Sequence, residues 1–329
     1  MNIAEVFEQF TRLNVLIIGD VMLDSYLWGK AERISPEAPV PIVNVQKREI
    51  RLGGAANVAL NILSLGANPV LCSVIGQDID GEAFISLLDK HGMEKSGMIQ
   101  SADRPTTIKH RIIAGSQQML RVDSETDKPV TQDLTEKLFT KISNLMDSCQ
   151  VVIFEDYDKG VITPELIKKV VALTNSKGIP TIVDPKKRNF MAYEGVTLFK
   201  PNLKELKEGL KIDFDKADQA EVKQASEMLR EKLGCKANLI TLSEYGIFVS
   251  DGTDNHFLPA HLRSISEVSG AGDTVVSVAA LSMAIGLPLI QVAALSNLAG
   301  GIVCEYVGVV PIEKAHLLDE ARMLHLFSE

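Results

Sequence analysis

Short runs of β-branched and other apolar residues alternate along this chain with longer segments whose apolar positions recur at helical spacing. The clearest helical segment is Asp133–Met146, where leucine or isoleucine returns every three or four residues. Another helix is expected to begin at Thr163 as the N-cap, with Pro164 at the first helical position. The runs that predict strands are Val15–Ile18, Val70–Val74, Val151–Phe154, Thr181–Val183 and Leu239–Leu242.

This alternation predicts an α/β fold with a doubly wound, mostly parallel sheet and helices on both faces. No internal repeat or linker divides the chain, so residues 1–329 are expected to form a single domain. Ligands of such sheets most often bind in the crevice beyond the carboxyl ends of the strands. A ligand site is therefore expected at that edge of the sheet.

Two segments, about 34–52 and about 106–122, do not follow this strand–helix alternation, because extended patterns succeed one another there without a helix between them. The first has three prolines and then the alternating run Ile42–Val45, and the second contains Thr106–Ile113 and Met119–Val122. We expect these segments to form a small β-lid apart from the main sheet. An exposed apolar face on such a lid would attract a second copy, so the lid is also the expected homodimer contact.

Residues 274–304 carry no charged side chain, a length that raises the question of a transmembrane helix. The sequence Gly286-Leu287-Pro288 interrupts this stretch, and each half is too short to span a bilayer alone. Small residues are frequent in both halves and suit close packing. The stretch is therefore expected to form two buried helices.

The overall charge and the cysteines limit the class of partner and the compartment. The formal net charge is −9 and the isoelectric point is about 5.3, which argues against nucleic acid or an anionic membrane as a partner. Four cysteines are scattered singly without metal-like spacing, as expected for reduced thiols. The first ten residues lack the features of a signal peptide. A cytoplasmic protein is expected.

The strongest chemical signal is the motif Ser269-Gly270-Ala271-Gly272-Asp273-Thr274, directly before the first uncharged helix. Its glycines let the backbone approach a ligand, and a helix N-terminus there offers N–H groups and a positive dipole end to a phosphate. Asp273 would lie beside that anion site. Alternatively, Asp273 only caps the helix. No Walker A loop and no GxGxxG after a strand occur, which disfavours P-loop ATPases and dinucleotide-binding domains.

A second glycine motif, Gly53-Gly54-Ala55-Ala56-Asn57, precedes another expected helix, where Asn57 could simply satisfy local backbone groups. Together the two motifs resemble the signatures of the ribokinase-like (PfkB) carbohydrate kinases. Between them, Pro201–Glu205 is similar to the family's N-x-x-E motif and Thr241–Gly246 to its nucleotide turn. The resemblance runs from Val15 to Pro311, although Ser243 stands where many relatives have glycine.

The resemblance implies ATP-dependent phosphorylation of a sugar hydroxyl, with ATP and Mg²⁺ as cofactors. One carboxylate would remove the hydroxyl proton, while backbone amides stabilise charge on the transferred phosphoryl group. The residues implied for this step are Asp273, Gly270, Ala271 and Gly272. Those implied for the nucleotide are Asn202, Glu205, Ser243, Glu244, Gly246 and Asn297. Asn202 and Glu205 would also bind Mg²⁺, partly through water. The alternative for this pair is an ordinary helix start. The alternative for Asn297 is an ordinary buried amide.

Several segments are more specifically similar to bacterial D-glycero-β-D-manno-heptose 7-phosphate kinases. These are Arg33–Pro41, Arg104–Lys109, Gln117–Asp123, Asp156–Gly160 and Asp184–Lys186. The resemblance implies phosphorylation of the C1 hydroxyl to the 1,7-bisphosphate, for lipopolysaccharide core precursors. The residues implied for the sugar are Asp24, at the end of the first strand, Gly53, Gly54 and Asn57, with Asp156. The HxGH motif of a fused nucleotidyltransferase does not occur, so the resemblance implies a stand-alone kinase.

A phosphorylated substrate needs local cations on this acidic protein, and basic residues flank the predicted lid and the strand that ends at Val183. The candidates are Lys109, Arg111, Arg121, Lys186 and Arg188. For any one of them, solvated surface charge is the alternative. The sequence also leaves open another PfkB kinase, acting on fructose 1-phosphate, ribose or a nucleoside, and a sugar-binding sensor without catalysis.

Overall fold

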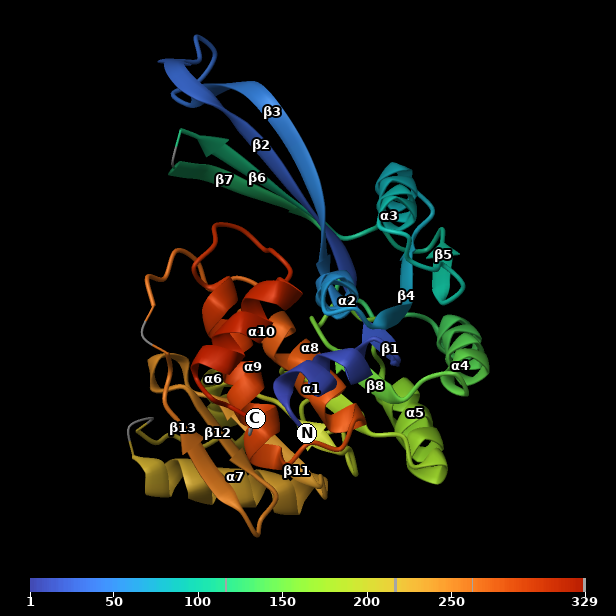
Figure 1. The fold of residues 1–329 in the computed structure, drawn as a ribbon. Coiled ribbons are helices and arrows are strands. Elements are labelled where there is room, and N and C mark those ends of the chain that lie inside the picture. Colours follow the sequence, from blue (N-terminus) through green and yellow to red (C-terminus); the bar gives the residue numbers. More distant parts are fainter. Residues whose placement is uncertain (116, 216–217, 262, 328–329) are drawn as a thin grey trace.

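The structure, a computed structural model, describes residues 1–115, 117–215, 218–261 and 263–327, and across these residues the strands form two separate sheets (Figure 1). The larger sheet has the order β13-β12-β11-β10-β9-β8-β1-β4-β5. Pairings of β12 with β11 and with β13 are antiparallel, and the remaining pairings are parallel. Its strands are β1 (Asn14–Gly19), β4 (Asn68–Gly76), β5 (Met98–Ser101), β8 (Val151–Glu155), β9 (Thr181–Asp184), β10 (Leu198–Phe199), β11 (Ala237–Thr241), β12 (Ile247–Ser250) and β13 (Asn255–Leu258). The five predicted strands are confirmed.

Helices cover both faces of this sheet and enclose two hydrophobic cores. Residues of α1, α2, α3, α8, α9 and α10 make up one core, and residues of α4, α5, α6 and α7 make up the other. Alternation along β1 explains the two layers, because Val15 and Ile17 enter the first core while Leu16 and Ile18 enter the second. The helices are α1 (Ile3–Phe10), α2 (Ala55–Ser64), α3 (Ile79–Lys90), α4 (Gln132–Met146), α5 (Pro164–Lys177), α6 (Leu203–Leu210), α7 (Gln219–Leu233), α8 (Ala271–Ala284), α9 (Leu289–Val303) and α10 (Lys314–Met323).

Local sequence signals set the ends of these helices. The Thr163 side chain accepts a hydrogen bond from the Leu166 amide, and Pro164 is the first residue of α5, as predicted. The uncharged stretch forms α8 and α9, whose break contains Gly286 at a φ of +72°. Two buried helices are thus confirmed there. In the described residues, no helix combines the length and the apolar character that crossing a membrane requires.

The second sheet projects from the body of the molecule (Figure 1) and has the order β3-β2-β6-β7. Strands occupy both segments predicted to form the lid, about 34–52 and about 106–122. Ser116 in the second segment lies outside the described residues. Large apolar side chains on this sheet are exposed, including Ile50, Leu120 and Val122. Its strands are β2 (Val21–Ile34), β3 (Pro41–Gly54), β6 (Ile108–Ala114) and β7 (Gln117–Ser124).

The predicted extent of this region was wrong at its first boundary. The expected start near residue 34 misses β2, which begins at Val21 and pairs with β3 and β6 along most of its length. Asp24 consequently lies within β2, and not at the end of the first strand, because β1 ends at Gly19. The mixed polar and apolar sequence of β2 does not alternate cleanly, since its first half is buried on both sides and its second half is exposed.

Gly19 lies in close contact with the neighbouring strand in the middle of the large sheet. It is the register partner of Glu155 in β8, and a Cβ at this position would overlap the Glu155 carbonyl oxygen. A side chain here must push backbone apart, and neighbouring backbone in a central strand cannot move without disturbing the pairing.

We expect Gly19→Ala to lower the free energy of unfolding by about 3 kcal/mol, because overpacking a rigid core strains the backbone. The measurement is urea denaturation. A matched control is Gly178→Ala, where a Cβ meets open space and only the positive φ of 68° is unfavourable; its expected loss is about 1 kcal/mol. Equal losses in the two variants would contradict the close approach of β1 and β8.

Candidate active site

One part of the candidate site lies at the carboxyl ends of the parallel strands, and the other part lies on the second sheet. Gly19 ends β1, Glu155 ends β8 and Asp184 ends β9, and the strand register places these three positions side by side. Asn202 follows β10 and forms a bridge with Thr241 at the end of β11. The edge predicted for ligands therefore holds one part of the candidate site.

Asp273 occupies the first turn of α8 and is buried, with 5% of its surface exposed. Its Oδ2 accepts a hydrogen bond of 2.6 Å from Asn57 Nδ2, and its Oδ1 accepts one of 2.8 Å from the Tyr157 hydroxyl. No side chain caps α8; its N-cap is Gly270 at a φ of +83°, a conformation that favours glycine. The capping alternative for Asp273 is therefore wrong.

Burial raises the pKa of Asp273 to about 6, and the negative charge of Asp184 adds to this effect. The hydrogen bonds from Asn57 and Tyr157 and the charge of Lys200 act in the opposite direction. A carboxylate with a pKa near 6 is ionised at neutral pH and accepts a proton more readily than an exposed aspartate. This geometry suits a general base.

Asn57 connects the two glycine motifs in space. It lies on α2, whose N-cap Gly54 has a φ of +61°, and its side chain reaches Asp273 instead of the local backbone. Its Oδ1 atom is buried and makes no hydrogen bond. A Cβ on Gly270 would contact Asn57 Nδ2 at 3.3 Å. The structure thus brings Asn57, Gly270 and Asp273 together.

Sequence reasoning missed an ionic cluster beside Asp273. Glu155 is fully buried, and its pKa is well above the usual range because of burial and then the charges of Asp184 and Asp273. Asp184 accepts a contact of 2.8 Å from the buried Lys200 ammonium. Burial disfavours the charge of Lys200, but the combined attraction of the neighbouring carboxylates, led by Asp184 and Glu205, outweighs burial and raises the pKa of Lys200. Acidic residues that directly end predicted strands were the signal available in the sequence.

Asn202 and Glu205 form a capping box at the start of α6. Asn202 Oδ1 accepts from the Glu205 amide, and Glu205 Oε2 accepts from the Asn202 amide, each at 2.9 Å. The other Glu205 oxygen lies 2.8 Å from Lys186 Nζ. The pair is thus the ordinary helix start that was the alternative. Its oxygens are already engaged, so contact with a metal through water fits it better than direct ligation.

The predicted nucleotide residues lie near one another beyond β11. Ser243 and Glu244 are exposed in the 3₁₀ turn η1 (Ser243–Tyr245), and Ser243 has a φ of +55°, which explains why glycine suits this position. Gly246 approaches Leu258 so closely that a Cβ would overlap its carbonyl oxygen. Asn297 on α9 donates a hydrogen bond of 2.8 Å to the carbonyl of the next residue, Pro259.

Asp24 and Gly53 adjoin each other on the second sheet, since a Cβ on Gly53 would contact the Asp24 carboxylate. Asp24 is buried and forms an ion pair with Arg111 of β6. The Arg111 guanidinium also lies 5.3 Å from the centre of the Tyr26 ring, and that of Arg51 lies 5.0 Å from the same ring. Sequence reasoning missed Arg51 and Tyr26, because cross-strand neighbours depend on register.

The other predicted cations are dispersed. Lys109 forms ion pairs with Asp123 and Glu125, and Arg121, about half exposed, also contacts Asp123. Arg188 pairs with Asp127 at the surface. Lys186 lies 5.3 Å from the centre of the Tyr157 ring, so it is beside the Asp273 end of the site. The structure does not assemble the five cations into one cluster.

Asp156 and Asp20 have structural partners. Asp156 accepts hydrogen bonds from Asn189 Nδ2 at 3.0 Å and from the Tyr193 hydroxyl at 2.7 Å. Asp20 accepts hydrogen bonds from the backbone N–H groups of Tyr157, Lys159 and Val161. Both carboxylates therefore hold the segment that follows β8, and Asp156 has no hydrogen bond to Asp24 or Asn57 among the described residues.

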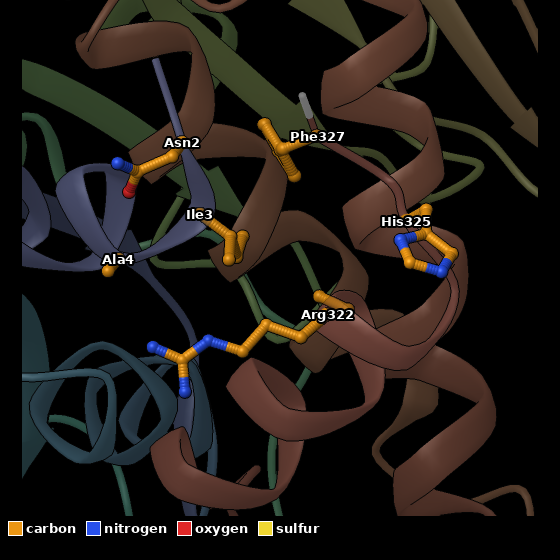
Figure 2. Close-up of a pocket in the computed structure, with 7 residues that line it drawn as sticks. Asn2, Ile3, Ala4, Arg322, His325 and Phe327 are labelled. Atoms are coloured by element: carbon orange, nitrogen blue, oxygen red, sulfur yellow. The ribbon is translucent and has the colours of Figure 1, made fainter. Parts of the chain in front are cut away.

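A pocket of about 390 Å³ lies elsewhere, between α1 and the C-terminal segment (Figure 2). It is lined by Asn2, Ile3, Ala4, Ala321, Arg322, His325 and Phe327. None of these residues is a predicted site residue, and none of the described residues that line the pocket is a carboxylate. It is therefore separate from the candidate active site.

A model of the pfkB family of carbohydrate kinases matches residues 12–315. The bifunctional protein HldE of Wolinella succinogenes is 38% identical over 297 residues, which cover 90% of this chain and 62% of that protein. The bifunctional protein HldE of Pelobacter propionicus is 37% identical over 330 residues, covering 100% and 67% respectively. The chain thus spans about 62% to 67% of the length of these two relatives.

Solved structures share the fold at low sequence identity. Phosphofructokinase-2 from Escherichia coli in complex with potassium has a TM-score of 0.77 and 18% identity, covering 95% of this chain and 99% of that one. Arabidopsis thaliana ribokinase complexed with ribose and ATP has a TM-score of 0.71 and 16% identity, covering 93% and 98%. The ribokinase-like fold predicted from the sequence is confirmed.

Burial raises the pKa of Asp156 to about 6, and the charge of Asp20 adds to this. An acid with a raised pKa holds its proton more tightly in the folded state, so its contribution to stability falls as the pH rises from about 4 through about 6. The unfolding free energy of the wild type should therefore decrease between pH 4 and pH 7. We expect this decrease to be about 3 kcal/mol smaller in Asp156→Asn. The measurement is chemical denaturation across that range.

The exposed Asp103→Asn should instead follow the wild-type pH dependence. If the unfolding free energy of Asp156→Asn also followed the wild-type pH dependence, the pKa of Asp156 would not be raised in the folded protein.

Proposed function

Because the chain belongs to the pfkB family of carbohydrate kinases, we propose that it transfers the γ-phosphoryl group of ATP to the C1 hydroxyl of D-glycero-β-D-manno-heptose 7-phosphate. The observation that carries the chemistry is the buried Asp273 carboxylate beside the Gly270 turn at the start of α8. The sugar is supported by the segments similar to heptose 7-phosphate kinases and by the relatives named HldE. The product would be the 1,7-bisphosphate, a precursor of the lipopolysaccharide core made in the cytoplasm.

In the proposed reaction Asp273 takes the proton of the C1 hydroxyl as its oxygen attacks the γ-phosphorus. A bond forms between that oxygen and phosphorus, and the bond from phosphorus to the β–γ bridging oxygen breaks, so ADP leaves. Asn57 and Tyr157 hold the Asp273 carboxylate in one orientation. Amides of Gly270, Ala271 and Gly272 at the N-terminus of α8 would stabilise the charge of the transferred group.

Nucleotide binding is proposed for the residues beyond β10 and β11. Asn297 and the Gly246 turn lie near one another and would accommodate the base. Bound Mg²⁺ would neutralise the phosphate charge during transfer. Asn202 and Glu205 would contact it through water, because the capping box occupies their oxygens.

The proposed sugar site lies between the two sheets, with Asp24, Gly53, Gly54 and Asn57. Asp24 would accept sugar hydroxyls while paired with Arg111. Among the five cations predicted for the substrate phosphate, Arg111 is best placed because it contacts Asp24. Lys186 lies nearer the reacting end, beside Tyr157.

We also propose that the projecting sheet acts as a lid and mediates a homodimer, because Ile50, Leu120 and Val122 expose apolar surface there. Leu120→Glu should convert a dimer into a monomer in sedimentation velocity, since a buried unpaired charge is unfavourable. Asp103→Asn, which lies outside the strands of that sheet, serves as the control. A monomeric wild type at high concentration would contradict the dimer.

The direct test of the function is ATP turnover with heptose 7-phosphate, fructose 1-phosphate, fructose 6-phosphate, ribose and adenosine. Efficient turnover of heptose 7-phosphate alone would support the proposal. Preference for another sugar would retain the kinase and reject the heptose. Sugar binding without turnover of ATP would indicate a sensor.

We expect Asp273→Asn to reduce kcat by a factor of roughly 10² or more, because the proton acceptor is lost while its shape is kept. The free energy of unfolding should not fall, since a buried acid is replaced by a neutral amide. Both quantities are measured on the purified variant. Near-normal turnover by the folded variant would reject Asp273 as the base.

Neutralising the cation that holds the substrate phosphate should raise KM for heptose 7-phosphate by roughly 10- to 100-fold, as expected for a lost charge-assisted contact. We expect this result for Arg111→Gln and not for the half-exposed Arg121→Gln on the same sheet. Measuring KM for the dephosphorylated heptose separates the phosphate contact from the loss of the Asp24 partner. Equal increases for both sugars would exclude Arg111 as the phosphate ligand.

A further inference from the structure

The segment between β13 and α8 ends in the Gly270 turn and has no regular structure of its own among its described residues. Residues 259–261 and 263–270 belong to no helix or strand. Most of the side chains from Ser264 to Ser269 are exposed. With so few buried side chains, the position of this segment depends on its contacts with neighbouring elements.

Arg263 connects this segment to the end of α9 and to α10. Its side chain is 9% exposed, and its Nη1 lies 3.2 Å from Glu305 Oε2, two residues beyond the end of α9. Nη1 also donates a hydrogen bond of 3.1 Å to Glu320 Oε1 on α10, while Nη2 donates one to Glu320 Oε2. A two-pronged pair of arginine and carboxylate fixes orientation as well as distance.

His316 extends these contacts to the segment that follows α9. Its Nε2 lies 2.9 Å from Glu320 Oε1, and its Nδ1 lies 3.4 Å from the Tyr306 hydroxyl. We call Arg263, Glu305, His316 and Glu320 the Arg263 cluster. It joins the segment before α8 and the segment after α9 to one helix, α10.

The same two segments meet beside the Gly270 turn. The amides of Ser266 and Glu267 both donate hydrogen bonds to the Cys304 carbonyl, at 2.8 and 3.2 Å. The Glu267 carboxylate accepts one of 2.7 Å from the Gly308 amide. A Cβ on Gly270 would lie 3.1 Å from Val309 Cγ1. The position of the turn therefore depends on how the two segments are held together.

The cluster is better explained by position than by stability. A buried ion pair adds little net stability, because the cost of removing both charges from water offsets much of their attraction. Arg263 and Glu320 are both largely shielded from water, at 9% and 16% exposed. Nε of Arg263 is buried without a hydrogen-bond partner among the described residues. What these contacts supply is a fixed geometry for an otherwise exposed segment.

We propose that Arg263 is a positioning residue for phosphoryl transfer: by binding Glu305 and Glu320, it fixes the Gly270–Gly272 amides that receive the transferred group. Donors that are fixed before the reaction stabilise developing charge, and a misplacement of about 1 Å can lower the rate by roughly 10²-fold. The role in transfer rests on the proposed function. The restraint on the segment does not.

The first measurement is backbone hydrogen exchange of the full chain, without nucleotide or sugar. In Arg263→Gln we expect the amides of Ser266 and Glu267 to exchange at least tenfold faster than in the wild type, because local opening becomes easier. The matched control is Lys169→Gln, since Lys169 also bridges two glutamates, Glu136 and Glu165, but between α4 and α5. This control should leave the exchange of both amides unchanged.

The second measurement is turnover with the sugar that the wild type phosphorylates. We expect Arg263→Gln to lower kcat by roughly 10- to 100-fold and to change KM for the sugar by less than about threefold, because Arg263 acts on the turn and not on the sugar. Arg263→Lys keeps the charge but not the two-pronged contact, so both measurements should give intermediate values. Lys169→Gln should retain the wild-type kcat.

Each outcome decides one part of the proposal. Wild-type exchange of Ser266 and Glu267 in folded Arg263→Gln would reject the restraint, whether or not the protein turns over ATP. Faster exchange with an unchanged kcat would reject the role in transfer. A wild type that phosphorylates no sugar would reject the proposed function and that role together, while exchange would still decide the restraint.

A milder variant keeps the test valid if Arg263→Gln does not fold. Glu305→Gln removes one ion pair and leaves both contacts with Glu320. We expect faster exchange of Ser266 and Glu267 in this variant too, by a smaller factor. If Arg263→Gln did not fold and Glu305→Gln exchanged like the wild type, the restraint would be rejected.

Discussion

The hydrogen bonds that Asn57 and Tyr157 donate to Asp273 are the interaction on which the candidate site depends. They join three parts of the chain that are far apart in sequence: α2, the segment after β8, and α8. Burying a carboxylate is unfavourable unless donors compensate it, so these contacts both fix the carboxylate and make its burial tolerable. The resulting pKa of about 6 combines the opposing effects of burial and of the two donors.

Several buried charged side chains lie together at the same edge of the sheet. Lys200 and Asp184 form a buried ion pair beside Asp273, and Lys186 links Glu205 to the Tyr157 ring. A buried pair of this kind is not primarily a source of stability, because desolvation offsets much of the attraction. Its consequence is a fixed local field, which is the property that phosphoryl transfer requires.

The residues of the candidate site come from both sheets, one in the body of the molecule and one that projects from it. Asp273, Asn202 and the turn at Gly246 lie on elements packed against the large sheet, whose two cores are continuous with its central strands. Asp24 and Arg111 lie on the projecting sheet, which has exposed apolar side chains and no helical layer of its own in the described residues. A sugar bound between Asp24 and Asp273 would contact both parts, and closure over it would exclude water.

Local patterns in the sequence predicted five strands of the large sheet and the helices α4, α5, α8 and α9, because hydrophobic periodicity, the Thr163 cap and the break at Gly286 act over a few residues. The glycine motif at Gly270 likewise indicated the start of α8. Only the tertiary structure decided which side chains meet: that Asn57 binds Asp273, that Asp156 turns to Tyr193, and that Glu155 is left without a partner. The physical reason is that these contacts depend on strand order and register, which bring residues 37 to 216 positions apart within hydrogen-bond distance. No local sequence pattern specifies strand order or register.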